Sequence, residues 1–273
     1  MNDKILLFIP GYNCEKQVIR VLGQLTPEIL EHIQEVIFVN NRSTDNTEKA
    51  VLAYKESHPE INLHVLRNDD NYNLGGSHKV AFDYAMANNF DYVIVLHGDD
   101  QGDIKDIKEI LKTKEYKNYD CMLGARFMKG SKLEGYSKFR TFGNRVYNML
   151  FSIAVRKRIY DLGSGLNIYS TKMLENRFYY KFPDRLTFNY CMILATHYYK
   201  QKIKFFPITW REDDQVSNVK LTSQALNVLK MLFKYFINNK YIEQEFRDKV
   251  IDQYTSQEIE ECKHNKGMEK NEK

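Results

Sequence analysis

The sequence has few cysteines and no strong excess of charge of one sign, and each absence excludes a class of protein. Its 4 cysteines (Cys14, Cys121, Cys191 and Cys262) lie far apart and form no CxxC pair. This excludes a disulfide scaffold and a cysteine-type zinc site, and it suits a reducing compartment. Lysine and arginine number 40 against 36 aspartates and glutamates, a net charge of +4. That balance is too mild for a protein that binds nucleic acid.

Long apolar runs are also absent. No stretch reaches the ~18 apolar residues that cross a bilayer, and the longest runs, such as Ile5–Pro10 and Met149–Val155, have the size of core elements. The N-terminus enters an apolar run at once, without the basic region, long apolar region and cleavage site of a signal peptide. We therefore expect a cytoplasmic protein, while contact with the inner face of a membrane stays open.

What is present is enough for one sizeable domain, since the chain has 273 residues and 43% of them are hydrophobic. Over roughly the first 125 residues, short apolar runs alternate with amphipathic stretches. This alternation predicts an α/β fold with a mostly parallel sheet covered by helices on both faces. The apolar runs are Ile5–Ile9, Val36–Val39, Leu63–Leu66, Tyr92–Leu96 and Cys121–Gly124, and the helical stretches are Lys16–Leu25, Asp45–Ser57, Ser77–Ala87 and Ile104–Lys112.

The rest of the chain divides by composition. Gly124 to Gly143 is rich in glycine, serine and basic residues, which predicts a mobile loop. A further strand is expected at Ile203–Pro207 and an amphipathic helix at Leu221–Ile237. From Glu243 the chain is polar and charged, and we expect it to fray. The predicted organisation is a domain over residues 1–220, a helix over 221–242 and a tail over 243–273.

Polar clusters follow three of the predicted strands directly, at residues 10–13, 40–43 and 97–101. In parallel sheets ligands bind at the carboxyl ends of the strands. The sharpest cluster is His97-Gly98-Asp99-Asp100-Gln101, whose carboxylates suit Mg²⁺ or Mn²⁺ bound together with substrate phosphates. The alternative is a polar turn in which Asp99 or Asp100 caps the helix at Ile104.

Four segments in this order and spacing resemble the family 2 glycosyltransferases of GT-A fold: PGYNCE, VNNRSTDNT, NYNLGGSHKVAFDYA and VLHGDDQGD. The resemblance covers roughly residues 5–220. It is closest to the branch with dolichyl-phosphate mannose synthase and the polyprenyl-phosphate sugar transferases. It implies transfer of a sugar from a UDP- or GDP-linked donor, usually with Mg²⁺ or Mn²⁺, and a Rossmann-like GT-A sheet.

The first two family motifs imply a nucleotide pocket. Pro10, Tyr12 and Asn13 match the family's P-A-Y-N-E, and Tyr12 offers a ring for stacking and a hydroxyl donor. Asn40 and Asn41 replace the two leading aspartates of D-D-G-S-T-D-x-T. An amide can still hydrogen-bond a base or ribose, but the change puts in doubt which base is read. Ser43 and Asp45 of this motif are candidates to cap the next helix.

The next two motifs imply diphosphate and metal contacts. Gly75 and Gly76 resemble the family's Asn-x-Gly-x-Gly segment, where glycine permits close approach of the backbone to a ligand and a helix N-terminus favours an anion. By resemblance to D-A-D-L-Q, Asp99 and Gln101 are metal ligands. His97 replaces the first aspartate, and a neutral imidazole there would ligate Mn²⁺ or bond the ribose.

Basic residues further along resemble those that bind the acceptor and the leaving group. Arg126 and Arg140 match the branch's G-S-R segment and downstream arginine, which suits an anionic acceptor; the alternative is a solvated basic loop. Arg211, Ser217 and Lys220 match its late segment and would close over the donor diphosphate. Asp161–Leu166 resembles the segment that shapes the floor of the acceptor site.

One absence bears on the acceptor. Many relatives that use a hydroxyl acceptor carry a Glu-Asp pair that supplies the general base. Between Gly165 and Ile203 the obvious carboxylate is Asp184 alone. A phosphate acceptor needs no base, so an inverting transfer to a polyprenyl phosphate is favoured. A sugar hydroxyl of a surface polysaccharide or glycolipid remains an alternative acceptor. A non-catalytic nucleotide-sugar binding protein is the rival from another class.

Two helical stretches bear on partners. Phe142–Val155 and Leu221–Ile237 could lie on a membrane face as peripheral contacts, or pack on the sheet or on a second subunit. The sequence leaves open the sugar, the base and a homo-oligomeric state.

Overall fold

The fold is built on an eight-stranded sheet with the strand order β10-β3-β2-β1-β4-β7-β5-β8. The computed structural model describes residues 3–212 and 221–260. β7 runs antiparallel to β4 and β5, β10 runs antiparallel to β3, and the other pairs are parallel, which confirms the predicted mostly parallel sheet. The strands are β1 (Ile5–Gly11), β2 (Glu35–Asn40), β3 (Leu63–Asn68), β4 (Tyr92–Leu96), β5 (Cys121–Ala125), β7 (Leu166–Ser170), β8 (Ile203–Pro207) and β10 (Ser256–Glu258).

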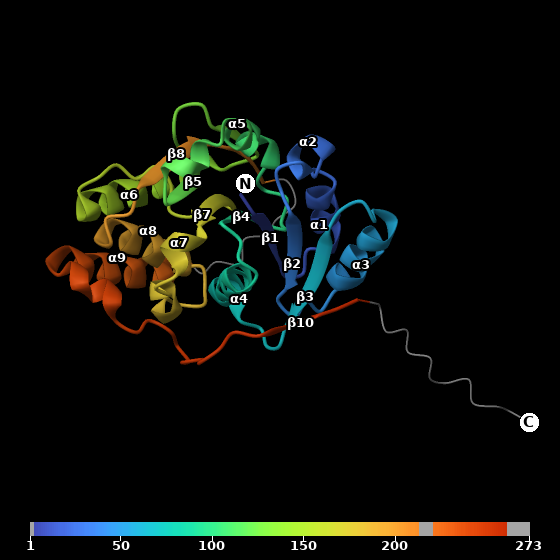
Figure 1. Ribbon diagram of the computed structural model, residues 1–273. Coiled ribbons are helices and arrows are strands. Elements are labelled where there is room, and N and C mark those ends of the chain that lie inside the picture. Colours follow the sequence, from blue (N-terminus) through green and yellow to red (C-terminus); the bar gives the residue numbers. More distant parts are fainter. Residues whose placement is uncertain (1–2, 213–220, 261–273) are drawn as a thin grey trace, which may run out of the picture.

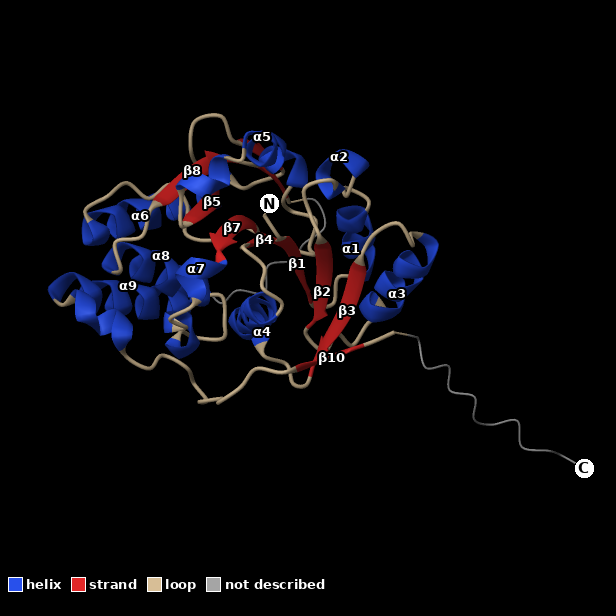
Figure 2. Ribbon diagram, in the orientation of Figure 1, coloured by secondary structure: helices blue, strands red, loops and turns tan. Residues whose placement is uncertain are grey.

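Helices cover both faces of this sheet (Figures 1 and 2). One face packs against α1 (Glu15–Leu22), α2 (Pro27–Leu30), α3 (Thr47–Ser57) and α5 (Lys108–Thr113). The other packs against α4 (Asn73–Ala87), α6 (Lys138–Val155), α7 (Thr171–Leu174), α8 (Phe188–Tyr198) and α9 (Leu221–Ile237). Short 3-10 helices lie at η1 (Ile104–Ile107), η2 (Glu115–Asn118), η3 (Phe178–Lys181) and η4 (Asn239–Glu243).

β1 shows why the central strands are almost continuously apolar. Side chains alternate between the two faces of a strand. Leu6 and Phe8 therefore join the core under α4 and α8, while Ile5, Leu7 and Ile9 join the core under α1 and α3. Because both faces are covered, each position of the strand is buried. This buried strand places its polar continuation, from Pro10 onward, at the carboxyl edge of the sheet.

The structure departs from the sequence prediction in the middle of the chain. The segment from Gly124 to Gly143, predicted to be a loop, contains β6 (Lys132–Glu134), which pairs in parallel with β9 (Thr209–Arg211). It also contains the start of α6, at Lys138. β7 was not foreseen, and it separates β4 from β5 in the sheet.

The predicted fraying from Glu243 is wrong for residues 243–260. β10 pairs with the edge strand β3, and Ile259 N–H donates to the carbonyl of Val65. Tyr254 is buried against Tyr72 and Lys79, so apolar and polar contacts both hold this segment on the domain. The remainder of the predicted tail, residues 261–273, lies outside the described residues.

None of the helices within residues 3–212 and 221–260 combines the length and the apolarity that a bilayer crossing requires.

Candidate functional site

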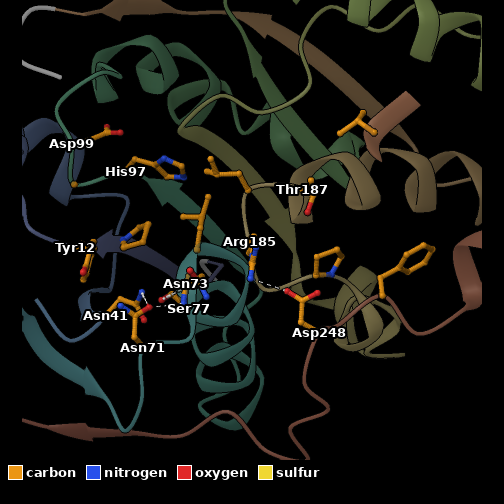
Figure 3. A pocket seen from close by; sticks show the side chains of 18 of the residues that line it. Tyr12, Asn41, Asn71, Asn73, Ser77, His97, Asp99, Arg185, Thr187 and Asp248 are labelled. Carbon is orange, nitrogen blue, oxygen red and sulfur yellow. Dashed lines mark hydrogen bonds and ion pairs between the residues drawn. The ribbon is translucent and has the colours of Figure 1, made fainter. Parts of the chain in front are cut away.

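A cavity of about 810 Å³ opens at the carboxyl ends of β1, β2 and β4, which is the size of a small-molecule site. One wall of the cavity, the strand-side wall, is formed by the ends of β1, β2 and β4 and by the start of α4. Figure 3 shows these side chains facing a second wall. That wall is formed by the loop before α8, by α9 and by the segment after η4. The strand-side residues include Pro10, Tyr12, Asn41, Asn71, Asn73, Ser77, His97 and Asp99; the opposite wall includes Arg185, Leu186, Thr187, Asn227, Val228, Met231 and Asp248.

The tip of β4 contributes Asp99 to the cavity and turns the next carboxylate away from it. Asp100 has a left-handed backbone (φ 60°). Its carboxylate accepts hydrogen bonds from Arg20 at 2.6 Å and Gln24 at 2.9 Å. The carboxylate of Asp99 accepts the backbone N–H of Gln101 at 3.3 Å, and no side chain of the described residues donates to it. Of the adjacent carboxylates, Asp99 is therefore the one available to a ligand.

Burial raises the pKa of Asp99 to about 6, and the neighbouring Asp100 charge acts in the same direction. A divalent cation would favour the ionised carboxylate. Mg²⁺ and Mn²⁺ are commonly held by one or two carboxylates together with substrate phosphates. Asp99 at the cavity wall fits that role, although no cluster of three acidic, histidine or cysteine side chains exists in the described part of the chain. Gln101 does not line the cavity, and its carbonyl accepts the N–H of Arg211.

His97 lines the same tip but is locked into the protein. The backbone N–H of His97 donates to the carbonyl of Gly165, and a Cβ added at Gly165 would lie 2.8 Å from the imidazole. Only glycine therefore allows this loop to close on the ring. Burial and the charge of Arg126 lower the pKa of His97 to about 4, so the ring is neutral. Its Nε2 is buried without a partner in the described residues.

The end of β1 presents Pro10 and Tyr12 to the cavity, as the sequence predicts. The Tyr12 ring is 51% exposed, which leaves it available for stacking. Asn13 has another role. It has a left-handed backbone, its N–H donates to Ser43 Oγ at 3.0 Å, and its Oδ1 accepts the N–H of Thr44 at 2.8 Å. It thereby ties the loop after β1 to the loop after β2.

The two asparagines after β2 point in different directions. Asn40 donates to Glu48 at 2.7 Å and accepts the N–H of Ser43, so its amide is used within the protein. Asn41 lines the cavity and donates to Asn71 Oδ1 at 2.9 Å. Its own Oδ1 accepts from Asn68 and from the N–H of Tyr72. At the end of β2, the cavity is therefore lined by side-chain amides, and not by the carboxylates of the family motif.

Gly75 and Gly76 do not line the cavity. They lie in the first turn of α4, and a Cβ added at Gly75 would lie 2.5 Å from the carbonyl oxygen of Pro183. The N–H of Gly75 donates to the carbonyl of Asp184 at 2.6 Å. The glycines thus allow the loop before α8 to pack on the helix, and the ligand-facing positions of this turn are Asn73, Leu74 and Ser77.

Each of the three arginines predicted at the site lies beside carboxylates. Arg126 forms a two-pronged pair with the buried Asp161, at 2.8 and 2.7 Å, which gives Asp161 a structural role. Arg140 binds both oxygens of Glu212 at 2.6 Å. The guanidinium of Arg211 lies 3.6 Å from Asp100 and 3.7 Å from Asp103. None of the three lines the cavity. Ser217 and Lys220 lie outside the described residues.

A cation that the sequence analysis missed does line the cavity. Arg185 lies in the loop before α8, and its guanidinium is 3.1 Å from Asp248 (Figure 3). Both side chains are well exposed, so this pair is weak and can be exchanged for a ligand. Its neighbour Asp184 is instead bound by Lys79 at 2.6 Å and by Tyr254 at 2.8 Å. Asp184 is therefore not a free general base.

A sequence model of glycosyl transferase family 2 matches residues 7–178, which is more than half of the chain. The chain belongs to glycosyl transferase family 2. The resemblance seen in the sequence is thus confirmed, and the protein is a glycosyltransferase. Two relatives show how similar the chain is to other proteins. The protein MJ0544 of Methanocaldococcus jannaschii is 27% identical, over 85% of this chain and 98% of that one. A dolichyl-phosphate beta-glucosyltransferase of Dictyostelium discoideum is 21% identical, over 86% of this chain and 76% of that one.

Solved structures of glycosyltransferases with the GT-A fold superpose on this chain. S. aureus TarS 1-349 in complex with UDP-GlcNAc superposes with a TM-score of 0.59 at 19% identity, over 86% of this chain and 67% of that one. The mannosyltransferase PcManGT from Pyrobaculum calidifontis, in complex with GDP-Man and Mn²⁺, superposes with a TM-score of 0.54 at 16% identity. The superposition covers 85% of this chain and 61% of that one. At these identities the similarity shows the fold alone.

Proposed function

We propose that this family 2 glycosyltransferase transfers a sugar, with inversion, from a nucleotide diphosphate donor to a polyprenyl phosphate, and that it requires a divalent cation. The observation that carries the proposal is Asp99. Asp248, the other carboxylate of the cavity, has Arg185 beside it, whereas Asp99 has no basic partner among the described residues. The Mn²⁺ in the complex of PcManGT supports the requirement for a divalent cation.

The strand-side wall of the cavity binds the donor in this reaction. The ring of Tyr12 stacks on the base, and the amides of Asn41 and Asn71 bind its edge or the ribose. Asp99 would hold Mg²⁺ or Mn²⁺, and the cation would supply positive charge to stabilise the departing nucleoside diphosphate.

The acceptor assignment rests on charge and on the state of the candidate base. Asp184 is bound by Lys79 and Tyr254, so it cannot take a proton from a hydroxyl acceptor as it stands. A phosphate acceptor is already an anion and needs no base. Arg185 is the cation placed to bind it, in preference to Arg126 and Arg140, which are held by carboxylates. The dolichyl-phosphate glucosyltransferase among the relatives supports a lipid phosphate. Such an acceptor would place the enzyme at the inner face of a membrane.

A radiolabelled-donor assay tests the acceptor. The protein is incubated with UDP- and GDP-sugars, with and without Mn²⁺, and with a polyprenyl phosphate or with soluble saccharides. Label transferred to the lipid is the expected result. Transfer of label to a saccharide alone would show that the acceptor is a sugar hydroxyl and not a lipid phosphate. Donor binding in calorimetry without transfer to either would indicate a nucleotide-sugar binding protein.

Asp99→Asn tests the metal, with the exposed Asp252→Asn as matched control. Loss of the metal ligand should reduce turnover by about 100-fold or more, because a bound cation supplies several kcal/mol of charge stabilisation. The thermal shift produced by a donor with Mn²⁺ should vanish in Asp99→Asn and persist in Asp252→Asn. A folded Asp99→Asn variant with full activity would contradict the proposal.

A further inference from the structure

The large apolar side chains that are exposed gather on two helices. Four lie on α6 and five on α9, out of thirteen exposed in the described residues. The two helices contact each other at one end of the molecule (Figure 1). We call the nine the α6–α9 surface: Phe139, Phe142, Met149, Ile153, Leu226, Leu229, Phe233, Phe236 and Ile237.

α9 is apolar on two opposite sides. Val228, Met231, Leu232 and Tyr235 are buried in the core, at the spacing of one helix face. The exposed residues of α9 recur at the same spacing on the other side, and Phe233 and Ile237 are 64% and 69% exposed. A helix that only covers the sheet would carry polar residues on that side. The outer side of α9 is therefore suited to contact with a second apolar surface.

The charged side chains on these two helices are all of one sign. α6 and α9 contain no aspartate or glutamate, whereas Lys138, Arg145, Lys230 and Lys234 are exposed on them. Arg156, Lys157 and Arg158 follow α6 directly and are exposed as well. Apolar side chains flanked by basic ones match an anionic lipid surface. A second copy of the chain would instead bring like charges together.

The same helix also forms part of the cavity. Asn227, Val228 and Met231 line its wall, next to the exposed Leu186. α9 thus separates the ligand space from the α6–α9 surface by the width of one helix. A lipid that enters from a bilayer under this surface has a short path to the site.

We propose that the α6–α9 surface docks on an anionic lipid bilayer, with the phenylalanines inserted at the interface and the lysines and arginines on the headgroups. This deepens the proposed function, since it gives the route of a lipid acceptor. It is tested separately, because vesicle binding needs neither donor nor turnover.

The test is co-sedimentation of the full chain with vesicles of phosphatidylcholine alone or with about 30 mol% phosphatidylglycerol. We expect binding to the anionic vesicles that weakens as salt rises from about 0.05 to about 0.5 M. Phe233→Ser combined with Phe236→Ser should weaken binding at least about tenfold. Val250→Ser, at an exposed apolar residue outside both helices, is the matched control and should bind as the parent does.

Lys230→Glu tests the charge, with Lys49→Glu on α3, at the opposite end of the molecule, as control (Figure 1). Reversal at Lys230 should weaken binding about tenfold and reversal at Lys49 should not. Unchanged thermal midpoints show that the variants are folded. Equal binding of all variants, or no binding to either vesicle, would overturn the proposal. Self-association that the phenylalanine variants abolish would overturn it in favour of a second copy.

Discussion

Acidification should destabilise this protein through His78, a buried histidine on α4. The ring is 1% exposed and lies among Phe8, Phe82, Phe188 and His97. Burial, and then the nearby His97, lowers its pKa to about 3. The unfolded chain has the ordinary value of about 6.5. Between pH 6.5 and pH 3, His78 is therefore protonated in the unfolded state and neutral in the folded state. The free energy of unfolding falls as the pH falls through this range.

The magnitude follows from the two pKa values. Between pH 7 and pH 5, His78 alone should cost about 2 kcal/mol, at 1.36 kcal/mol for each pH unit below 6.5. The substitution His78→Phe keeps a ring of similar size in an aromatic site but removes the titration. Its free energy of unfolding should accordingly fall by about 2 kcal/mol less than that of the parent over this interval.

Urea unfolding at pH 7 and pH 5 measures both free energies by linear extrapolation. Phe82→Leu is the control, because it removes packing beside His78 without removing a titrating group. It should lose stability at both pH values and keep the pH dependence of the parent. If His78→Phe lost as much between pH 7 and pH 5 as the parent does, the histidine would not be held neutral by burial, and the reasoning would be refuted.

Three further variants separate structural from ligand-binding roles. Arg126→Met should lower the free energy of unfolding by about 3–5 kcal/mol, because Asp161 is left buried without its cation, and a loss below about 1 kcal/mol in urea would argue against a structural pair. Gly75→Ala should lower it by about 1–3 kcal/mol through the contact with the Pro183 carbonyl, and an unchanged melting midpoint would contradict that close packing. Tyr12→Ala should weaken donor binding in calorimetry by roughly 5- to 100-fold while Tyr12→Phe retains it, and equal losses would argue against ring stacking.

Much of the sheet could be predicted because its signal is local. The apolar runs at β1 to β5 are bounded by polar clusters, and α9 has the predicted bounds. β7 and β10 were missed for different reasons. β7 follows the turn at Asp161–Gly165 without a pattern of its own and is defined by its neighbours in the sheet. β10 has only three residues, Ser-Gln-Glu, and is held by the edge it covers.

The sequence predicted which segments form the site, but not which of their side chains point into the cavity. Asn40 and Asn41 are adjacent, and the sequence could not say which faces the cavity, because neighbouring residues at a strand end point to opposite sides. The partners of the arginines lie far along the chain. Arg126 meets Asp161 and Arg140 meets Glu212 only through the fold. No local signal marked Arg185 as the cation at the cavity.

The pairing of β10 with β3 has a consequence for handling this protein. Without β10, the outer edge of β3 would present a row of unsatisfied backbone donors and acceptors, and such rows recruit strands from other molecules. The chain's own segment around Gln257 acts as a cover for this edge. Shortened versions that stop before Ser256 should consequently be prone to aggregation even if the cavity at the carboxyl ends of β1, β2 and β4 still forms.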